Sequence, residues 1–172
     1  MKKYIAIALL VVIVVAGYFI FRRQSPKVIV NQNPTISETL KLSSDWKTIT
    51  DTTTVVKLEK TVTSGLKPEV VYKQTTSKDA ATPAKYVDNL KAGARATLSG
   101  LVYVTDKRFS QESGYSALLT GYYLNKGKKV TIDQRIFITG QTVNTFSGSS
   151  DAGQSAEVSQ VLSSLTKSKV GQ

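Results

Sequence analysis

Residues 115–139 read YSALLTGYYLNKGKKVTIDQRIFIT and carry the strongest strand pattern of the chain. From Val130 to Thr139, mostly apolar side chains such as Ile132 alternate with polar ones. Alternation with a period of two is typical of a strand that buries one face against a core. Residues 115–124 form a second run, joined to the first through a turn at 125–128. The sequence therefore predicts a long antiparallel hairpin.

Shorter strands are predicted on both sides of this hairpin. β-branched and aromatic residues are concentrated before it at 46–49, 55–59, 69–74 and 101–104. After a tight turn at Gly140–Gln141, residues 142–147 form the last predicted strand. The segment GSSDAG at 148–153 is expected to be a loop.

Two predicted helices complete the domain. Thr82 and Pro83 match a helix cap followed by proline at the first helical position. Apolar residues then recur at helical spacing over about 83–98, and Gly100 ends the helix. A C-terminal helix begins near Ser155, with an acidic first turn and a basic last turn that complement its dipole. The sequence predicts an α+β domain with two helices against the faces of an antiparallel sheet.

The N-terminal segment is predicted to cross a membrane. Residues 4–21, YIAIALLVVIVVAGYFIF, contain no charged side chain and are flanked by Lys2, Lys3, Arg22 and Arg23. A helix of about eighteen residues spans roughly 27 Å, close to the hydrocarbon thickness of a bilayer. We expect a single-pass anchor over 1–23, a stalk over 24–37, a domain over 38–168 and a tail over 169–172.

Two alternatives remain open for this segment. A cleaved signal peptide also has a basic start and an apolar stretch, and Val14 and Ala16 are small enough for a cleavage site. We favour an uncleaved anchor because the apolar run continues past Ala16. The basic flanks are nearly balanced, so the positive-inside rule gives only a slight preference. We favour a cell-membrane protein whose C-terminal domain is extracytoplasmic.

Composition excludes several kinds of site. The chain has no cysteine and no histidine, so disulfides, Cys/His metal centres and imidazole-dependent catalysis are excluded. No nucleophile elbow and no glycine-rich phosphate loop is present. Asp151 lacks the repeated acidic neighbours of a calcium loop. We expect a protein that is not an enzyme and that holds no metal and no cofactor.

The basic charge favours an anionic partner. The chain has 23 Lys and Arg against 12 Asp and Glu, a net charge of +11, which attracts anionic lipid, wall polymer or nucleic acid. The tightest cluster is Lys126, Lys128 and Lys129. These lysines and Tyr123 are candidate contacts for an anionic ligand or a partner, and a solvated surface is the alternative. Without interleaved aromatic and basic residues there is no base-stacking platform, which disfavours nucleic acid.

Asp133 and Arg135 lie two residues apart on the second strand of the hairpin. Their side chains should share a face opposite to that of Ile132 and Ile136. They are either a surface ion pair, worth under about 1 kcal/mol, or part of a face that a helix covers. The sequence leaves both open.

The order of elements resembles that of the PsbP/Mog-like proteins. The residues that carry the resemblance are Trp46, the helix at 85–98, GYSALL at 114–119, the hairpin end RIFITG at 135–140, and LSSL at 162–165. The likeness covers about 38–168 and implies an α/β/α sandwich around an antiparallel sheet. The family includes the extrinsic PsbP subunit of photosystem II and the Ran-binding Mog proteins. The resemblance implies binding of partner proteins or assistance in assembling membrane complexes.

Two family roles do not carry over. Photosynthetic PsbP proteins have metal-linked histidines, which this chain lacks, and the Mog role rests on an acidic surface, whereas this chain is basic. We expect a non-catalytic, membrane-tethered extracytoplasmic module that binds or helps assemble an envelope protein. This function predicts one exposed apolar patch. The alternative is an electrostatic binder of anionic wall polymer, lipid or DNA, which predicts clustered lysines and salt-sensitive binding.

Overall fold

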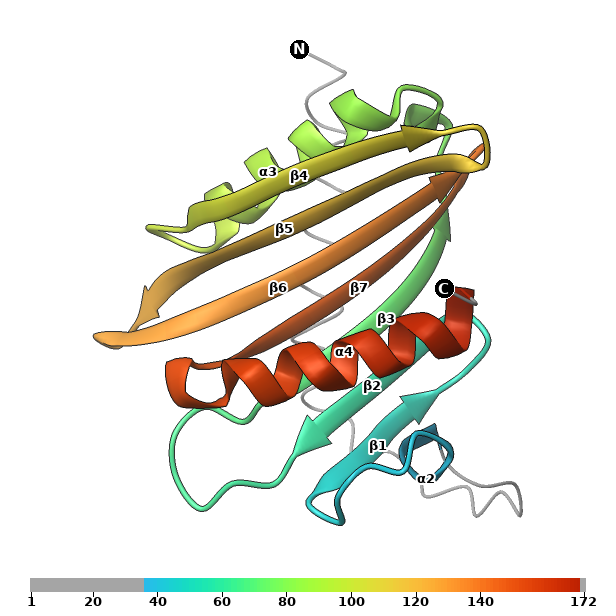
Figure 1. Cartoon of the computed structure of the whole chain (residues 1–172). Coiled ribbons are helices and arrows are strands. Elements are labelled where there is room, and N and C mark those ends of the chain that lie inside the picture. The colour runs from blue at the N-terminus through green and yellow to red at the C-terminus, as the bar shows by residue number, and fades with distance from the viewer. Residues whose placement is uncertain (1–35, 171–172) are drawn as a thin grey trace.

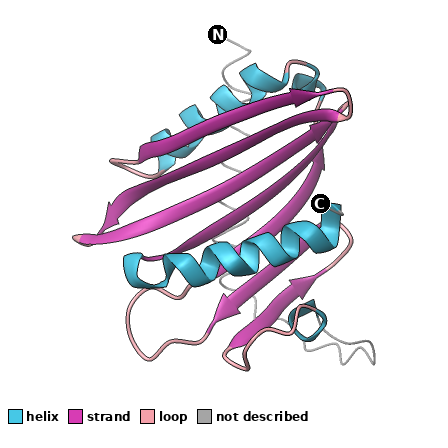
Figure 2. Cartoon of the chain, viewed as in Figure 1, coloured by secondary structure: helices cyan, strands magenta, loops and turns pink. Residues whose placement is uncertain are grey.

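A seven-stranded antiparallel sheet organises the protein, and the computed structural model describes residues 36–170 (Figure 1). The strands are β1 (Trp46–Asp51), β2 (Val55–Lys60), β3 (Glu69–Thr76), β4 (Val102–Gln111), β5 (Gly114–Asn125), β6 (Lys128–Thr139) and β7 (Thr142–Asp151). The helices are α2 (Ile36–Thr39), α3 (Pro83–Thr97) and α4 (Ser155–Val170), with 3₁₀ turns at Lys78–Ala81 and Ala152–Gln154. Figure 2 shows how strands dominate the described region. The predicted α+β class is confirmed.

The strand order is β1-β2-β3-β7-β6-β5-β4, so β1 and β4 are the two edges. The predicted hairpin is present as β5 and β6, paired from Tyr115 with Ile138 to Asn125 with Lys128. Lys126 and Gly127 both have positive φ at the turn, as a two-residue hairpin loop of this twist requires. β3 pairs with β7, which joins the N-terminal strands to this hairpin in one sheet.

Helix α4 packs on one face of the sheet, mainly against β7 and β3, and the core beneath it extends to β1 and β2 (Figure 1). The buried side chains of this core are Ile36, Trp46, Val56, Leu58, Val70, Tyr72, Phe146, Val158, Val161, Leu162 and Leu165. Trp46 donates its indole N–H to Glu157 Oε1 at 2.8 Å, and Lys60 Nζ donates to Glu157 Oε2 at 2.6 Å. These bonds fasten the first turn of α4 to the β1–β2 edge.

Helix α3 packs on the opposite face, toward the β4 edge (Figure 1). The buried side chains of this second core are Ala80, Val87, Ala117, Leu119, Ile136, Ile138 and Val143. On β6, Ile136 and Ile138 therefore face α3, whereas Phe137 packs into the core beneath α4. As predicted, β6 buries one face, with Val130, Ile136 and Ile138 buried toward the α3 side, and α4 covers part of its other face.

The two helices are displaced toward opposite edges of the sheet. A helix with its side chains is roughly 10–12 Å wide and strands lie about 4.8 Å apart, so one helix covers only two or three strands. On the α4 side, the surface of β4 and of the neighbouring parts of β5 and β6 is left uncovered. We call this surface the open half-face.

Three boundaries differ from the sequence-based expectation. β4 runs to Gln111 and not only over 101–104, and β7 runs to Asp151. The predicted loop at 148–153 was therefore wrong, since Gly148 and Ser149 pair with β3 and β6. Ile36, placed in the predicted stalk, is buried in the core beneath α4. The expected anchor at 1–23 lies outside the described residues.

Within residues 36–170, no helix is both long and apolar enough to cross a membrane.

Gly148 sets how closely α4 approaches β7. A Cβ atom at Gly148 would lie 2.5 Å from Val158 Cγ1. We expect Gly148→Ala to push α4 outward and lower the free energy of unfolding by about 1–3 kcal/mol. Urea denaturation of the two proteins measures this. Gly153→Ala is the matched control, since a Cβ there has no atom within 4 Å, and equal losses in both variants would contradict the account.

Candidate functional site

Exposed apolar side chains gather on the open half-face. Val102, Val104, Phe109 and Leu124 are 45, 71, 52 and 63% exposed. The fifth large exposed hydrophobic side chain of the described residues, Ile49, lies on β1 at the other edge. Single exposed hydrophobic residues are ordinary, but a group of them on one surface marks an interaction site.

Strand register places this group on the α4 side of the sheet. Val102 pairs with Tyr122, Phe109 with Ser116, and Leu124 with Lys129. Tyr122 in turn pairs with Thr131, two residues before Asp133, whose carboxylate contacts α4. Because side chains alternate along a strand, Val102, Phe109 and Leu124 face the same way as α4. Val104 lies at the β-bulge between Tyr103 and Thr105 and lines the cleft on that same side.

Asp133 and Arg135 lie beneath α4. Ser159 Oγ donates to Asp133 Oδ2, and Arg135 Nη2 donates to Ser163 Oγ, both at 2.9 Å. The two charged groups are 3.8 Å apart, and their side chains are mostly buried. Of the two alternatives left open by the sequence, the structure supports the face that a helix covers.

A cleft of about 420 Å³ lies where the N-terminal part of α4 meets the open half-face. Its lining consists of Val104, Thr120, Gly121, Tyr122, Lys129, Thr131, Ile132, Asp133, Gly148, Ser150, Ser155, Ala156, Val158 and Ser159. Six residues of this lining carry hydroxyl groups and two are charged, but most of its exposed surface is apolar. The cleft therefore continues the apolar character of the open half-face.

The predicted basic cluster lies at the tip of the β5–β6 hairpin. Lys126, Lys128 and Lys129 are all exposed, and none of them forms an ion pair with a carboxylate of residues 36–170. Lys129 Nζ lies 4.2 Å from the centre of the Tyr122 ring, on the side of the open half-face. Tyr123 pairs with Val130 and faces the other way. The structure therefore brings Lys129 to Tyr122 and places Lys128 and Tyr123 on the α3 side.

Asp151 has a structural role at the end of β7. Its Oδ2 accepts a hydrogen bond from the backbone N–H of Leu66 at 3.2 Å. Among the described residues, no three His, Cys, Asp or Glu side chains lie close enough together to hold a metal ion.

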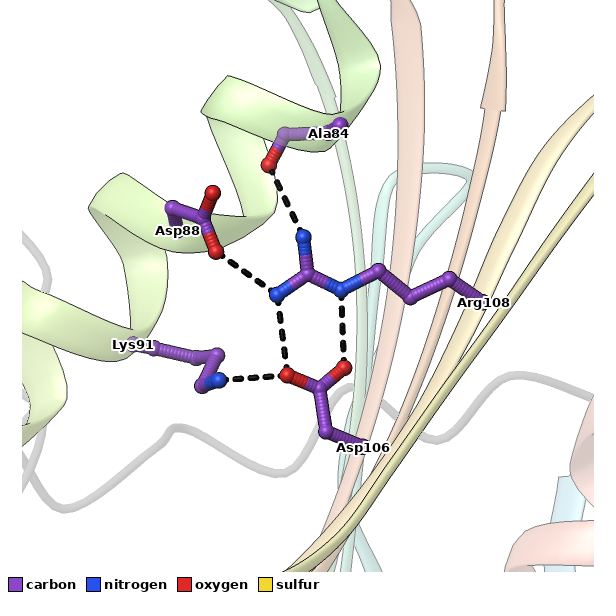
Figure 3. A network of polar contacts seen from close by, with 5 residues as sticks. All are labelled: Ala84, Asp88, Lys91, Asp106 and Arg108. Carbon is purple, nitrogen blue, oxygen red and sulfur yellow. Dashed lines mark hydrogen bonds and ion pairs between the residues drawn. The ribbon is translucent and has the colours of Figure 1, made fainter.

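A second group of charged side chains connects α3 to the edge strand β4 (Figure 3). Arg108 donates to Asp106 at 2.8 Å from both Nε and Nη2, and to Asp88 Oδ1 at 2.6 Å. Lys91 Nζ donates to Asp106 Oδ2, the oxygen that also accepts from Arg108 Nη2. Two cations thus balance two anions, and the charges satisfy one another. This network holds α3 on the sheet and leaves no net charge for a ligand.

The α3–β4 network should weaken in acid. The hydrogen bonds from Arg108 hold the pKa of the Asp106 carboxyl well below its usual range, although burial opposes them. A lowered folded-state pKa stabilises the protein above the unfolded value of about 3.9, and this stabilisation disappears as the pH falls below that value. We expect Asp106→Asn to lower the free energy of unfolding by about 1 kcal/mol at pH 7, the upper range for partly exposed ion pairs. The loss should be smaller at pH 3. Urea denaturation at both pH values measures this, and a pH-independent difference would contradict it.

Comparisons with known proteins find a similar fold but identify no family. No family model and no curated protein matches this chain. The structure is similar to that of PA94, a Pseudomonas aeruginosa protein of unknown function, with a TM-score of 0.51 and 14% identity over 66% of this chain and 83% of that one. LpqN, involved in cell envelope biogenesis of Mycobacterium tuberculosis, gives a TM-score of 0.49 and 14% identity over 76% and 92%. The PsbP/Mog-like assignment stays a prediction.

Proposed function

We propose that this chain is a non-catalytic, membrane-tethered extracytoplasmic module that binds an envelope protein, or helps to assemble one, through its open half-face. The observation that supports this proposal is the concentration of Val102, Val104, Phe109 and Leu124 on one uncovered surface. An accessory module of this kind was expected to expose one apolar patch.

The composition of the surface fits a protein partner. Val102, Val104 and Leu124 lie near Tyr122 at one end of the open half-face, and Phe109 lies toward the other end of β4, where it pairs with Ser116. Lys107, between Val104 and Phe109 on β4, and Lys129 place basic groups on the same face. Aromatic side chains are enriched at protein–protein interfaces, which favours a protein partner.

The support beneath the surface also favours docking. On one face of the sheet, β5 and β6 pack against the core beneath α3. On the other face, β6 packs in part against the core beneath α4. A surface that is ordered before binding loses little conformational entropy when it binds. The proposed anchor at 4–21 would keep this surface close to membrane partners and so raise their effective concentration.

Photo-crosslinking in intact cells tests this function. We expect a photoreactive phenylalanine analogue at position 109 and one at position 124 of the full chain to capture the same envelope protein. The matched control is the analogue at position 49, an exposed apolar site on β1, which should capture none. Adducts with lipid alone, or equal capture from all three positions, would contradict the proposal.

A second candidate function, binding of an anionic wall polymer or anionic lipid, is favoured by the three exposed lysines at the hairpin tip. They lack carboxylate partners among the described residues, so their charge is available to a ligand. We expect replacement of Lys126, Lys128 and Lys129 by glutamine to weaken polymer binding, and added salt to weaken it steeply. Cosedimentation of the full chain with teichoic acid measures this. Binding that is unchanged by both treatments would exclude this function.

A further inference from the structure

The outer side of β4 is an open edge of the sheet (Figure 1). On its inner side, β4 pairs with β5. On its outer side, no backbone group of residues 102–111 bonds to another backbone group of the described residues. In an antiparallel pair, alternate residues direct their N–H and C=O groups away from the neighbouring strand. A row of backbone donors and acceptors therefore faces outward along β4.

The other edge strand, β1, is a poorer template for a further strand. It has six residues, and its register shifts between Thr48 and Thr50. Its first N–H, that of Trp46, already donates to Ser43 O at 3.0 Å, and α2 lies against it. The bulge in β4 lies near its start, so Thr105–Gln111 keep one unbroken register with β5. These seven residues exceed the roughly five or six of an average strand.

The two faces of the β4 edge differ in what they offer to a partner. Asp106 and Arg108 face α3, and both are bound in the network that holds this helix. Lys107 and Phe109 face the other way, onto the open half-face. Phe109 is 52% exposed, and Lys107 is exposed and forms no ion pair with a carboxylate of residues 36–170. An added strand would therefore meet Lys107 and Phe109 with its own side chains.

The charge of Lys107 determines which kind of strand fits. The row on this face contains no acid, since it consists of Thr105, Lys107, Phe109 and Gln111. Two copies of β4, paired antiparallel about the middle of this row, would place their Lys107 side chains opposite or diagonal to each other, which destabilises a sheet. An edge lysine therefore opposes pairing with a second copy of this chain. It still admits a strand that places a carboxylate beside it.

We propose that β4 binds an extended segment of the partner protein as an additional strand, with an acidic side chain beside Lys107 and an apolar one beside Phe109. The proposal rests on the proposed function and deepens it, because it states how the partner meets the open half-face. In strand addition, main-chain hydrogen bonds supply affinity and alternate side chains supply specificity. Here the outward backbone groups of β4 have the first role, and Lys107 and Phe109 have the second.

The pattern of crosslinks along β4 tests the proposal. A photoreactive phenylalanine analogue is placed singly at positions 105, 109 and 111 of the full chain in intact cells, and mass spectrometry identifies the partner residues to which each analogue attaches. These positions share one face of β4. Because paired strands advance together residue by residue, we expect the three attachment sites to fall in order within one partner segment of about ten residues.

A charge reversal tests the role of Lys107. In the chain that carries the analogue at position 109, Lys107→Glu should lower capture about fivefold, because a like charge would then lie beside the acidic side chain of the partner. The matched control is Lys85→Glu, which reverses an exposed charge on α3 and should leave capture unchanged. Equal urea midpoints of the two variants would show that Lys107→Glu does not act through unfolding.

The outcomes separate this proposal from the proposed function. Attachment sites scattered over separate segments of the partner, or equal capture by both charge variants, would overturn strand addition and leave docking on the open half-face intact. Attachment to a second copy of this chain, or no capture from positions 109 and 124, would overturn both.

Discussion

Helix α4 meets β7 closely at Gly148, and this contact positions the helix on the sheet. A side chain at position 148 would collide with Val158. Because glycine has no side chain, α4 can approach the sheet closely here. Phe146, two residues earlier, is fully buried in the same contact and touches the rings of Tyr72 and Phe137. This contact places α4 mainly over β7 and β3, and it therefore determines which surface stays uncovered.

Both candidate sites follow from that placement. The open half-face exists because α4 lies toward the β1 edge while α3 supports β4, β5 and β6 from behind. The cleft exists because the first turns of α4 stand beside the uncovered strands. The ion network of Arg108 and Asp106 holds the supporting helix in place (Figure 3). An exposed apolar surface and a cleft are thus neighbours on one face of the sheet.

Much of the fold was accessible from the sequence, because local patterns determine it. The alternation at 130–139 and the proline at position 83 predicted the hairpin and α3 from neighbouring residues alone. Period-two patterning does not reveal which half of a strand a distant helix covers, so the exposure of Phe109 and Leu124 was not predictable. The strand at Gly148–Asp151 was also missed, since small residues resemble a loop when their partner strands are unknown.

The candidate site was predicted only in part. The lysines were recognised because they are adjacent in the sequence, and they do cluster at the hairpin tip. The choice between Tyr122 and Tyr123 depended on register, and a shift of one residue exchanges the two faces. Asp133 was noted, but its place beneath Ser159 depends on a contact between distant segments. Such contacts follow from packing and leave no local signal in the sequence.

We propose that the open half-face is exposed in the isolated protein and covered by a partner in the cell. The chain has no cysteine, so single variants Phe109→Cys, Leu124→Cys and Ile49→Cys each carry one thiol. The measurement is the rate at which a membrane-impermeant maleimide modifies each thiol in intact cells and in the purified full chain. The account predicts rapid modification of all three in the purified protein, and protection of positions 109 and 124, but not 49, in cells. Equal rates in cells and in the purified protein at 109 and 124 would contradict it.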